Sequence, residues 1–434
     1  MRERGLVTSL LVLVAVNILN FYDRQVPGAL AEPMRIEFGL TDAQLGLIGS
    51  AFIWLYAIVG VPLGHVADRW SRKKLLAVGM IIWSALTATA GLASSFGMLV
   101  FSRLGVAVGE AVAAPTGTSW IGDLFIASQR SRALSLFMLG VPIGQALSMY
   151  FSGPIAQAWG WRTAMVCAAV PALLLVPALL WLKEPERGAT ESHRHATAGA
   201  GSMWSVLRIP TLWWIIASGI FINFNMYAMG SFLPAFVSRI HGVSLAKSGI
   251  ASGTVYLVGG ICGGLFAGVW GDRIGVRRKD GRLLSAAVFA FIGAPAAYFG
   301  IVTPHGELLL ATGLLTLSYA TMNTYYGLVY SSIQDIVPPE KRGTTMALYF
   351  MLMYLCGASF GPYLTGHLSD VMAKRAAVAA GLVKVDEVAR ATGLQQAMIV
   401  IPVLSVALAL VLWAGSRTVA RDMERRDAAA HAAA

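Results

Sequence analysis

The stretch Gly64-His-Val-Ala-Asp68-Arg69 directly follows a long apolar segment of the chain. A close copy, Gly268-Val-Trp-Gly-Asp272-Arg273, follows another long apolar segment in the second half. Basic residues stand at matching distances after both copies: Lys73 and Lys74 after the first, Arg277 and Arg278 after the second. Because glycine allows tight turns and close helix approach, and the aspartates have Arg or Lys neighbours, we expect each stretch to form a short charged loop at a helix end.

A second pair of similar stretches supports an internal repeat. Ile121-Gly-Asp123 is followed by Arg130, and Ile333-Gln-Asp335 is followed by Arg342. Both pairs occur in the same order in the two halves, which indicates two copies of one structural unit.

The composition indicates a membrane protein. Of the 434 residues, 56% are hydrophobic and 13% are charged, and the mean hydropathy is +0.66. Soluble domains carry about 25% charged residues, so a soluble enzyme or a DNA-binding protein is excluded. Cys167, Cys262 and Cys356 lie in apolar runs without paired spacing, so we expect neither a disulfide framework nor a metal site. We also expect no cofactor.

Twelve apolar runs are long enough to cross a bilayer. A hydrocarbon core about 30 Å thick needs about 20 residues of helix. Each half contributes six runs, so the two repeats have parallel topology. The predicted spans lie near 7–31, 44–67, 75–95, 97–121, 131–157, 162–182, 211–238, 247–271, 283–302, 307–333, 343–371 and 394–415.

The basic residues predict the orientation. If the N-terminus is cytoplasmic, 23 of the 33 Lys and Arg residues fall in cytoplasmic segments. Lys and Arg prefer the cytoplasmic side, so we expect both termini there. The net charge of +11 is then a topology signal rather than a nucleic-acid footprint.

The spans divide the chain into two bundles. We predict an N-terminal six-helix bundle over residues 1–182, a cytoplasmic linker over 183–209, a C-terminal six-helix bundle over 210–416 and a cytoplasmic tail over 417–434. Small residues in spans five and eight predict close helix packing. These residues are Gly140, Gly144 and Ser148, and Gly259, Gly260, Gly263 and Gly264.

Taken together, the repeated motifs and the twelve spans resemble the major facilitator superfamily. Three stretches resemble its Spinster branch, which includes lysolipid and sphingosine-1-phosphate transporters. They are Asn20-Phe-Tyr-Asp23-Arg24, Arg103-Leu-Gly-Val-Ala-Val-Gly109-Glu110-Ala111, and the segment from Asp123 to Ser135. The resemblance implies an all-α membrane protein with twelve transmembrane helices in two pseudo-symmetric six-helix bundles.

The charged stretches at the helix ends are then candidates for a cytoplasmic latch. Such a latch would hold the two halves together on the inner side when the transporter faces outward. The alternative is that they only anchor the loops in the cytoplasm. The candidate latch residues are Gly64, Asp68, Arg69, Arg72, Lys73, Asp123, Arg130, Asp272, Arg273, Asp335 and Arg342.

Four charged residues stand inside predicted spans, all in the first half: Asp23, Arg24, Arg103 and Glu110. Charges within a bilayer are costly and mark cavities or partners. Asp23 lies about 24 Å along span one and Arg103 about 10 Å into span four from the other direction, so the two can share a level. The resemblance implies that spans one and four line the central cavity, and we therefore predict an Asp23–Arg103 ion pair in at least one state. Glu110 follows Arg103 by nearly two turns and shares its face.

We predict that these charges couple transport to protons. Glu110, deep in an apolar environment, can take up and release a proton, and Asp23 is the second candidate. A negatively charged substrate could compete for Arg103 and release Asp23 for protonation. The alternative is a static ion-pair cluster that holds spans one and four together, although such pairs add little net stability. Arg24 is either a cavity residue or an interfacial residue.

The second half has amides and aromatics where the first half has charges. By repeat, spans seven and ten correspond to spans one and four, so we expect their polar side chains to line the same cavity. For any single tyrosine, ordinary packing is an equal alternative. The candidate substrate-binding residues are Arg24, Arg103, Asn223, Asn225, Tyr227, Tyr256, Asn323, Tyr325, Tyr326 and Tyr349.

We therefore predict a proton-coupled secondary active transporter, not an enzyme. One charged wall and one aromatic wall suit an amphipathic anion such as a lysophospholipid or a sphingosine-1-phosphate-like molecule. The alternative is a proton-linked symporter of a small organic anion such as a sugar acid. We find no ATP-binding motif and no catalytic motif. The expected partners are the bilayer, the substrate and protons, with no nucleic acid, and we expect a monomer in a bacterial inner membrane.

Overall fold

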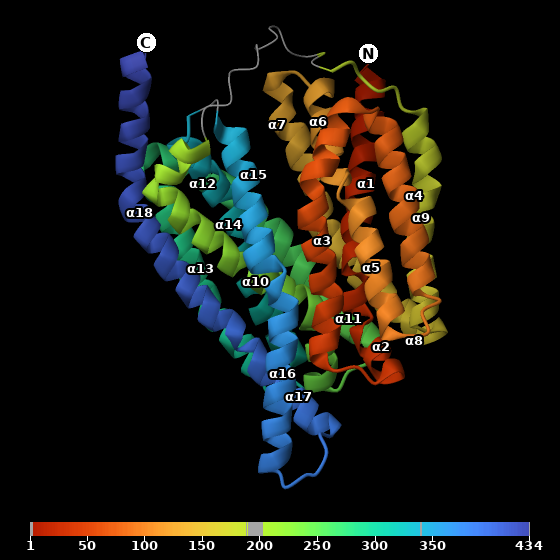
Figure 1. Cartoon of the computed structure of the whole chain (residues 1–434). Coiled ribbons are helices and arrows are strands. Elements are labelled where there is room, and N and C mark those ends of the chain that lie inside the picture. Colours follow the sequence, from red (N-terminus) through yellow and green to blue (C-terminus); the bar gives the residue numbers. More distant parts are fainter. Residues whose placement is uncertain (1–2, 188, 190–202, 339–340, 434) are drawn as a thin grey trace. The chain divides into compact units, whose positions relative to one another are not determined.

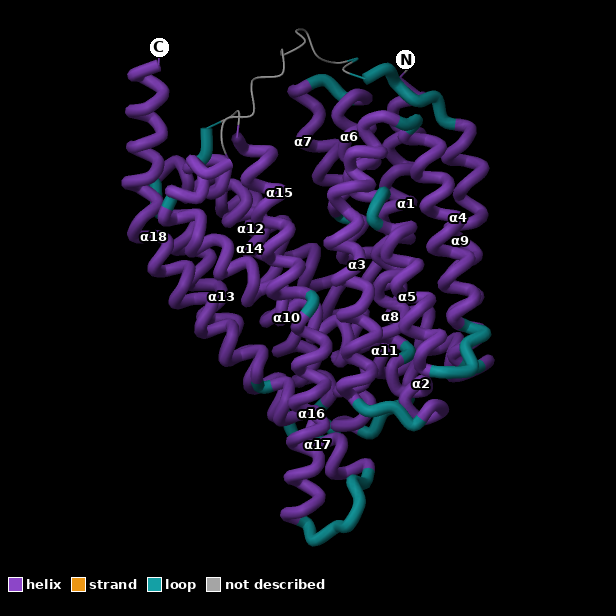
Figure 2. The backbone as a smooth tube through the Cα atoms, in the orientation of Figure 1, coloured by secondary structure: helices purple, strands orange, loops and turns teal. Residues whose placement is uncertain are grey.

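The computed structural model describes residues 3–187, 189, 203–338 and 341–433. Throughout these residues, regular structure is helical (Figure 2). The predicted all-α class is confirmed. The part of the predicted linker at 190–202 lies outside the described residues.

Eleven helical stretches in the described chain are long and apolar enough to cross a membrane. They overlap eleven of the predicted spans. Several are longer than predicted, whereas the stretch Asp42–Gly60 ends seven residues before the end of the predicted span 44–67. The remaining predicted span, 307–333, corresponds to the 29-residue helix α14 (Leu308–Ile336), which carries many threonines and tyrosines. The chain is therefore a multi-pass membrane protein.

Contacts divide the chain into two compact units. Unit 1 comprises residues 1–194 and 230–253, and unit 2 comprises 195–229 and 254–434. Helix α10 (Pro210–His241) is continuous, but its residues up to Met229 belong to unit 2 and those from Gly230 belong to unit 1.

Unit 1 is a bundle in which α1 packs on α8, and α4 packs on both α5 and α9 (Figure 1). Its helices are α1 (Glu3–Ala29), α2 (Ala31–Phe38), α3 (Asp42–Arg69), α4 (Arg72–Ala90), α5 (Phe96–Glu110), α6 (Ala113–Leu124), α7 (Ala127–Met138), α8 (Gly140–Trp159), α9 (Trp161–Trp181), the end of α10, and α11 (Leu245–Thr254) up to Gly253.

Unit 2 is built around α13 and α14, which pack on each other, on α12 and on α18. Its elements, besides the first part of α10, are the 3₁₀ helix η1 (Met203–Arg208), η2 (Val255–Gly259), α12 (Gly260–Arg277), α13 (Gly281–Val302), α14, α15 (Arg342–Met353), η4 (Tyr354–Ala358), α16 (Phe360–Ala379), α17 (Glu387–Met398) and α18 (Val400–Ala433). Both η2 and η4 are π turns. The predicted tail, 417–434, continues α18 as far as Ala433.

Small residues bring helices together as predicted for spans five and eight. A Cβ atom on Gly144 would overlap the backbone oxygen of Ile18 in α1. A Cβ atom on Gly263 would overlap the backbone oxygen of Ala320 in α14, whereas one on Gly264 would meet open space. The glycines in span eight therefore differ in role, with Gly263 at the helix contact and Gly264 outside it.

The expectation of a loop at Gly64 and Gly268 is wrong. Gly64 lies inside α3, Gly268 lies inside α12, and neither has another atom within 4 Å of a Cβ position. The helices continue to Arg69 and Arg277, where the positive side chains complement the negative end of the helix dipole.

Candidate functional site

A proline shapes the helix that carries two of the four membrane-embedded charges. Span four is broken between α5 and α6, at Ala111 and Val112. Pro115 lacks an N–H, and its ring clashes with the carbonyl four residues earlier, which belongs to Ala111. Glu110 is the last residue of α5 and therefore lies directly before this break.

The four charges form two ion pairs in unit 1. The predicted pair is present, with Arg103 Nη1 lying 3.7 Å from Asp23 Oδ2. Sequence reasoning missed the second pair, in which Arg24 Nε donates to Glu110 Oε2 at 3.1 Å. All four side chains are at most 7% exposed. Arg24 is therefore part of the buried cluster rather than an interfacial residue.

Neighbouring helices hold the cluster in place. Thr87 in α4 donates a hydrogen bond of 2.8 Å to Asp23 Oδ2. Arg24 Nη2 donates to Asn20 Oδ1 at 3.3 Å, one turn earlier in α1. The cluster thus joins α1, α4 and α5 through charged and polar side chains.

Two aromatic rings of α3 lie against the guanidinium groups. The Phe52 ring centroid is 4.8 Å from Arg103 Cζ and 5.2 Å from Arg24 Cζ. The Tyr56 ring centroid is 4.6 Å from Arg24 Cζ. A cation–π contact contributes about 0.5–1 kcal/mol at an exposed site and about 2 kcal/mol when it is desolvated. Phe52 and Tyr56 stand four residues apart in span two, and this spacing could have placed both rings on one helix face.

Unit 2 contains a cluster of aromatic residues centred on α14 and α15. The hydroxyl oxygens of Tyr325 and Tyr349 lie 2.9 Å apart, and Ser218 Oγ lies 2.8 Å from that of Tyr325. Tyr330, which was not predicted, packs edge-on against Tyr349 at 5.7 Å and also against Tyr326 and Phe350. Tyr325 and Tyr349 are buried, whereas Tyr326 and Tyr330 keep part of their surface exposed.

The other predicted binding residues of unit 2 lie around this cluster. Tyr326 donates to Asn223 Oδ1 at 3.4 Å. Tyr227 packs against Tyr354, and Tyr256 packs against Tyr319.

The side-chain nitrogens of the two remaining asparagines donate hydrogen bonds to groups of the protein itself. Asn323 donates to the backbone oxygen of Tyr319. Asn225 donates to the backbone oxygen of Ile401 and to Ser405 Oγ, both at 3.1 Å. The amide nitrogen of Asn225 is therefore committed to packing α10 on α18.

Two of the candidate latch aspartates each form an ion pair within their own unit. Arg72 at the start of α4 pairs with Asp123 at the end of α6, and Arg282 at the start of α13 pairs with Asp335 at the end of α14. Sequence reasoning did not single out Arg282. Asp272 and Arg273 are exposed, and Arg130 donates to the backbone oxygen of Phe125. The side chain of Asp68 lies outside the described part of the chain.

Glu184 completes the cluster at Arg72. Its carboxylate accepts hydrogen bonds from the Ser71 hydroxyl at 2.6 Å and from the backbone N–H of Arg72 at 2.9 Å. Burial alone would raise the pKa of Glu184, but the bonds from Ser71, from the N–H groups of Arg72 and Lys73 and from the Arg72 guanidinium outweigh burial and lower it. A carboxylate at a helix N-terminus also complements the helix dipole.

A third charged group joins the end of α10 to the rest of unit 1. Arg239 Nη1 and Nη2 each lie 2.9 Å from an oxygen of Asp42, and its Nε lies 2.8 Å from Glu32 Oε2. The side chains of Arg239 and Asp42 are at most 5% exposed. Sequence reasoning counted Arg239 only as an outside residue, because its partners are about 200 positions away in the chain.

Comparison with known proteins agrees with this architecture. The sequence pattern of the Major Facilitator Superfamily matches residues 13–362. An "MFS-type efflux pump" of Mycolicibacterium smegmatis is 31% identical over 360 residues, 83% of each chain. The human "Protein spinster homolog 1" is 29% identical over 396 residues, 83% of this chain and 72% of its own.

A solved structure shows the same fold along nearly the whole chain. It is that of a bacterial homologue of the human lysosomal transporter Spinster, in an inward-facing and unoccupied conformation. It has a TM-score of 0.86 at 26% identity and covers 97% of this chain and 99% of its own. The chain therefore belongs to the major facilitator superfamily, within which it is a Spinster-like membrane transporter.

Proposed function

We propose that this protein is a proton-coupled secondary active transporter of an amphipathic anion, such as a lysophospholipid or a sphingosine-1-phosphate-like molecule. The observation that carries the proposal is the buried cluster in unit 1, in which two carboxyl and two guanidinium groups pair within the membrane. Buried ion pairs contribute little net stability, so their presence favours a functional role.

The charge balance of the cluster suggests how a proton is coupled to the substrate. With all four groups ionised, the positive and negative charges are equal. An anionic group that binds Arg103 would displace Asp23, whose Oδ2 would keep only the Thr87 hydroxyl. An unpaired buried carboxylate costs several kcal/mol, so Asp23 or the adjacent Glu110 would take up one proton per bound negative charge.

Arg24 and Arg103 are the proposed sites for the anionic group of the substrate. The partly exposed tyrosines of unit 2, Tyr326 and Tyr227, are the better candidates for contacts with its apolar part. Tyr325 and Tyr349 hydrogen-bond to each other, which suggests that they support the cluster rather than contact the ligand.

The coupling is tested in proteoliposomes with Glu110→Gln and Asp23→Asn. We expect uptake driven by a pH gradient to fall at least about tenfold in at least one variant, which corresponds to about 1.4 kcal/mol. Substrate exchange without a gradient needs no net proton movement, so it should persist. Glu37→Gln, at a half-exposed carboxylate of the same unit, is the control and should transport normally. Wild-type gradient-driven uptake in both Glu110→Gln and Asp23→Asn would rule out the coupling.

The substrate class is tested separately by thermal shift of the purified protein. We would screen lysophospholipids, sphingoid phosphates and sugar acids. Stabilisation by a lipid that is lost in Arg103→Gln would support the proposal. Stabilisation by sugar acids alone would favour the small-anion symporter.

We further propose that the protein is a monomer of the bacterial inner membrane with both termini cytoplasmic. The 23 of 33 Lys and Arg residues that fall in the predicted cytoplasmic segments support this orientation. Asp123 and Asp335, each paired with an arginine at a neighbouring helix start, remain the best candidates for parts of a cytoplasmic latch.

A further inference from the structure

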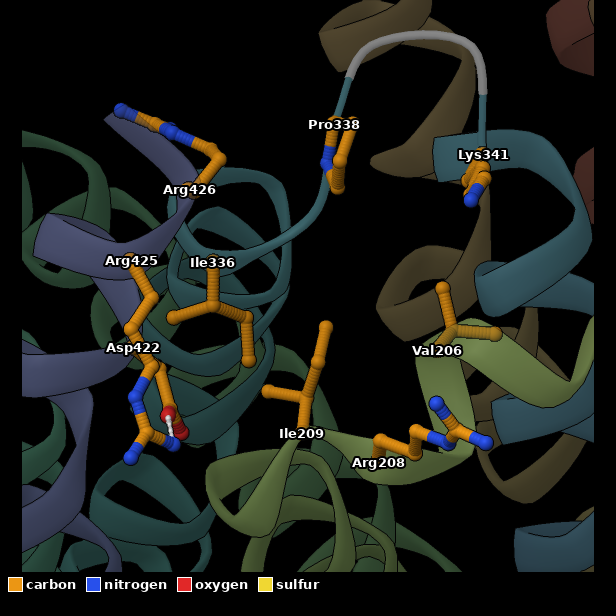
Figure 3. A pocket seen from close by; sticks show the side chains of 9 residues that line it. All are labelled: Val206, Arg208, Ile209, Ile336, Pro338, Lys341, Asp422, Arg425 and Arg426. Carbon is orange, nitrogen blue, oxygen red and sulfur yellow. Dashed lines mark ion pairs between the residues drawn. The ribbon is translucent and has the colours of Figure 1, made fainter. Parts of the chain in front are cut away.

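Among the described residues of unit 2, one cavity is lined largely by charged side chains and another almost entirely by apolar ones. Several charges of the first are already paired within the protein. Asp422 pairs with Arg425, as the dashed line in Figure 3 marks, and Arg426 pairs with Asp427. The apolar cavity is therefore the better candidate for a ligand site.

The apolar cavity lies between α10, α16 and α18 and has a volume of about 340 Å³. Isoleucine, leucine, valine and phenylalanine side chains line it, together with Thr365. A cavity of about 150 Å³ with such a lining holds one benzene molecule, so this one has room for roughly a dozen non-hydrogen atoms. Sites for small molecules have this character, with an apolar lining and a few polar groups that fix the orientation of the ligand.

The apolar cavity lies on a different side of α10 from the aromatic cluster of unit 2. Asn223 of α10 accepts a hydrogen bond from Tyr326 of that cluster. Phe221, which lines the cavity, stands two residues earlier and therefore lies about 200° round the helix. Leu364 also lines the cavity and is 43% exposed, so one side of the cavity lies at the surface of unit 2. The cavity is thus separate from the residues proposed to bind the transported substrate.

The apolar cavity lies within the hydrocarbon core of the bilayer. Thr365 stands six residues before the end of the predicted span 343–371, and Val400 stands six residues after the start of the predicted span 394–415. Both therefore lie about 9 Å below the same edge of the core, and Leu404 lies about 15 Å below it. Because a charged group at this depth is costly, a ligand of this cavity must be uncharged and soluble in lipid.

Thr365 brings an available hydrogen-bond donor to this apolar environment. Its side chain is 1% exposed, and its hydroxyl has no hydrogen-bond partner among the described residues. Other threonines of unit 2 donate to the backbone oxygen four residues earlier, as Thr312, Thr316 and Thr345 do. A buried hydroxyl is costly unless it is hydrogen-bonded, and rotation about χ1 can turn the Thr365 hydroxyl toward a ligand. A ligand with an acceptor would satisfy it.

We propose that this cavity binds an uncharged lipophilic molecule that accepts one hydrogen bond from Thr365, such as a molecule with a ketone or quinone carbonyl. Its apolar part would fill the space beside Phe221, Phe224 and Leu404. The chain of a membrane phospholipid fits less well. Its ester carbonyls stay beside the headgroup at the edge of the core, about 9 Å from the level of Thr365, and its methylene groups accept no hydrogen bond.

The test uses two probes of equal chain length, methyl nonyl ketone and undecane, which differ by one carbonyl oxygen. Each is titrated into the full chain in phosphatidylcholine nanodiscs, with its concentration expressed per lipid, and the thermal midpoint is measured. We expect the ketone to raise the midpoint of the wild type by about 1–3 °C. One hydrogen bond should let it act at a concentration about threefold to tenfold below that of undecane.

Thr365→Val removes the hydroxyl and keeps the branched side chain. We expect this variant to lose the advantage of the ketone over undecane and to keep the shift with undecane. Thr345→Val, at a buried threonine of α15 whose hydroxyl donates to the backbone oxygen of Lys341, is the matched control and should keep the advantage.

Leu404→Trp fills the cavity and should abolish the shift with both probes. Val403→Trp adds the same ring at a neighbouring residue that is 59% exposed and does not line the cavity, so it should keep the shift. Asp23→Asn, which alters only the charge cluster of unit 1, should also respond like the wild type. This result would separate the cavity from the proposed transport function.

Three results would contradict the proposal. Equal action of the two probes on the wild type would show that any hydrocarbon chain can fill the cavity. An undiminished advantage of the ketone in Thr365→Val would show that the hydroxyl does not bind it. Equal shifts in Leu404→Trp and Val403→Trp would show that the probes act elsewhere.

Discussion

The carboxylate of Glu184 stabilises the beginning of α4 through side-chain and backbone donors. Its pKa is below the ordinary value in the folded protein, so its contribution depends on pH. A group with a lowered pKa stabilises the fold above its unfolded value, which is about 4.3 for glutamate. That stability is lost as the pH falls through the lower, folded value.

We therefore expect Glu184→Gln to lower the free energy of unfolding by about 1–3 kcal/mol at pH 7, because hydrogen bonds to a charged acceptor are lost. The difference from the wild type should shrink below about pH 4. Thermal unfolding of the detergent-solubilised protein at both pH values measures it. The neighbouring exposed Glu186 provides the control, since Glu186→Gln should change little. A loss of the same size at both pH values would show that the charge is not responsible.

Single residues also show how far the site could be predicted. The Asp23–Arg103 pair could be predicted because helix rise puts both residues at one level and the family resemblance implies that spans one and four line the same cavity. The Arg24–Glu110 pair could not, because Arg24 points about 100° away from Asp23 on an ideal helix. It is the rings of Phe52 and Tyr56, on a third helix, that pack against Arg24 where it meets Glu110.

At the scale of elements, α12 contains two adjacent glycines with opposite environments. Alanine at Gly263 would overlap the backbone of α14, and backbone cannot move aside as a flexible side chain can. We expect Gly263→Ala to destabilise the protein by about 1–3 kcal/mol. Gly264→Ala meets no neighbour and improves helix propensity, so its stability should equal or exceed that of the wild type. Similar melting temperatures for the two variants would contradict the assigned helix contact.

Helix positions were predictable because hydrophobic runs of this length have few alternatives. Helix interruptions were not predicted, although Pro115 could have located the one that follows Glu110. The π turns η2 and η4 leave no comparable mark in the sequence. They depend on packing against other helices, which a single segment does not show.

At the scale of the whole molecule, the repeat predicted equivalent aspartates but only one of their partners. Arg72 and Arg282 have the same role, yet only Arg72 stands near a recognisable motif. Their pairing depends on how α4 meets α6 and how α13 meets α14. Which arginine pairs with each aspartate is determined by the tertiary structure and not by the spacing of the residues in the sequence.

The proposed orientation is tested with single cysteines. Val276 at the end of α12 is 90% exposed, and Val383 after α16 is 100% exposed. With Cys167, Cys262 and Cys356 replaced by alanine, we expect a membrane-impermeant maleimide to label Val383→Cys in intact spheroplasts. It should label Val276→Cys only after permeabilisation. The reverse pattern would invert the topology.

The π turn η4 imposes a constraint on the length of the chain. Before it, Tyr349 meets Tyr325 of α14. Near its end, Gly357 lies against the backbone of Ile220 in α10, and one turn later Gly361 lies against the backbone of Phe224. One residue more or fewer would turn these two faces about 100° relative to each other. The exposed loop at 381–384 could absorb the insertion or deletion of one residue. In η4 the same change would break one of these two contacts. In evolution, substitutions can accumulate along this segment, but its residue count must stay constant.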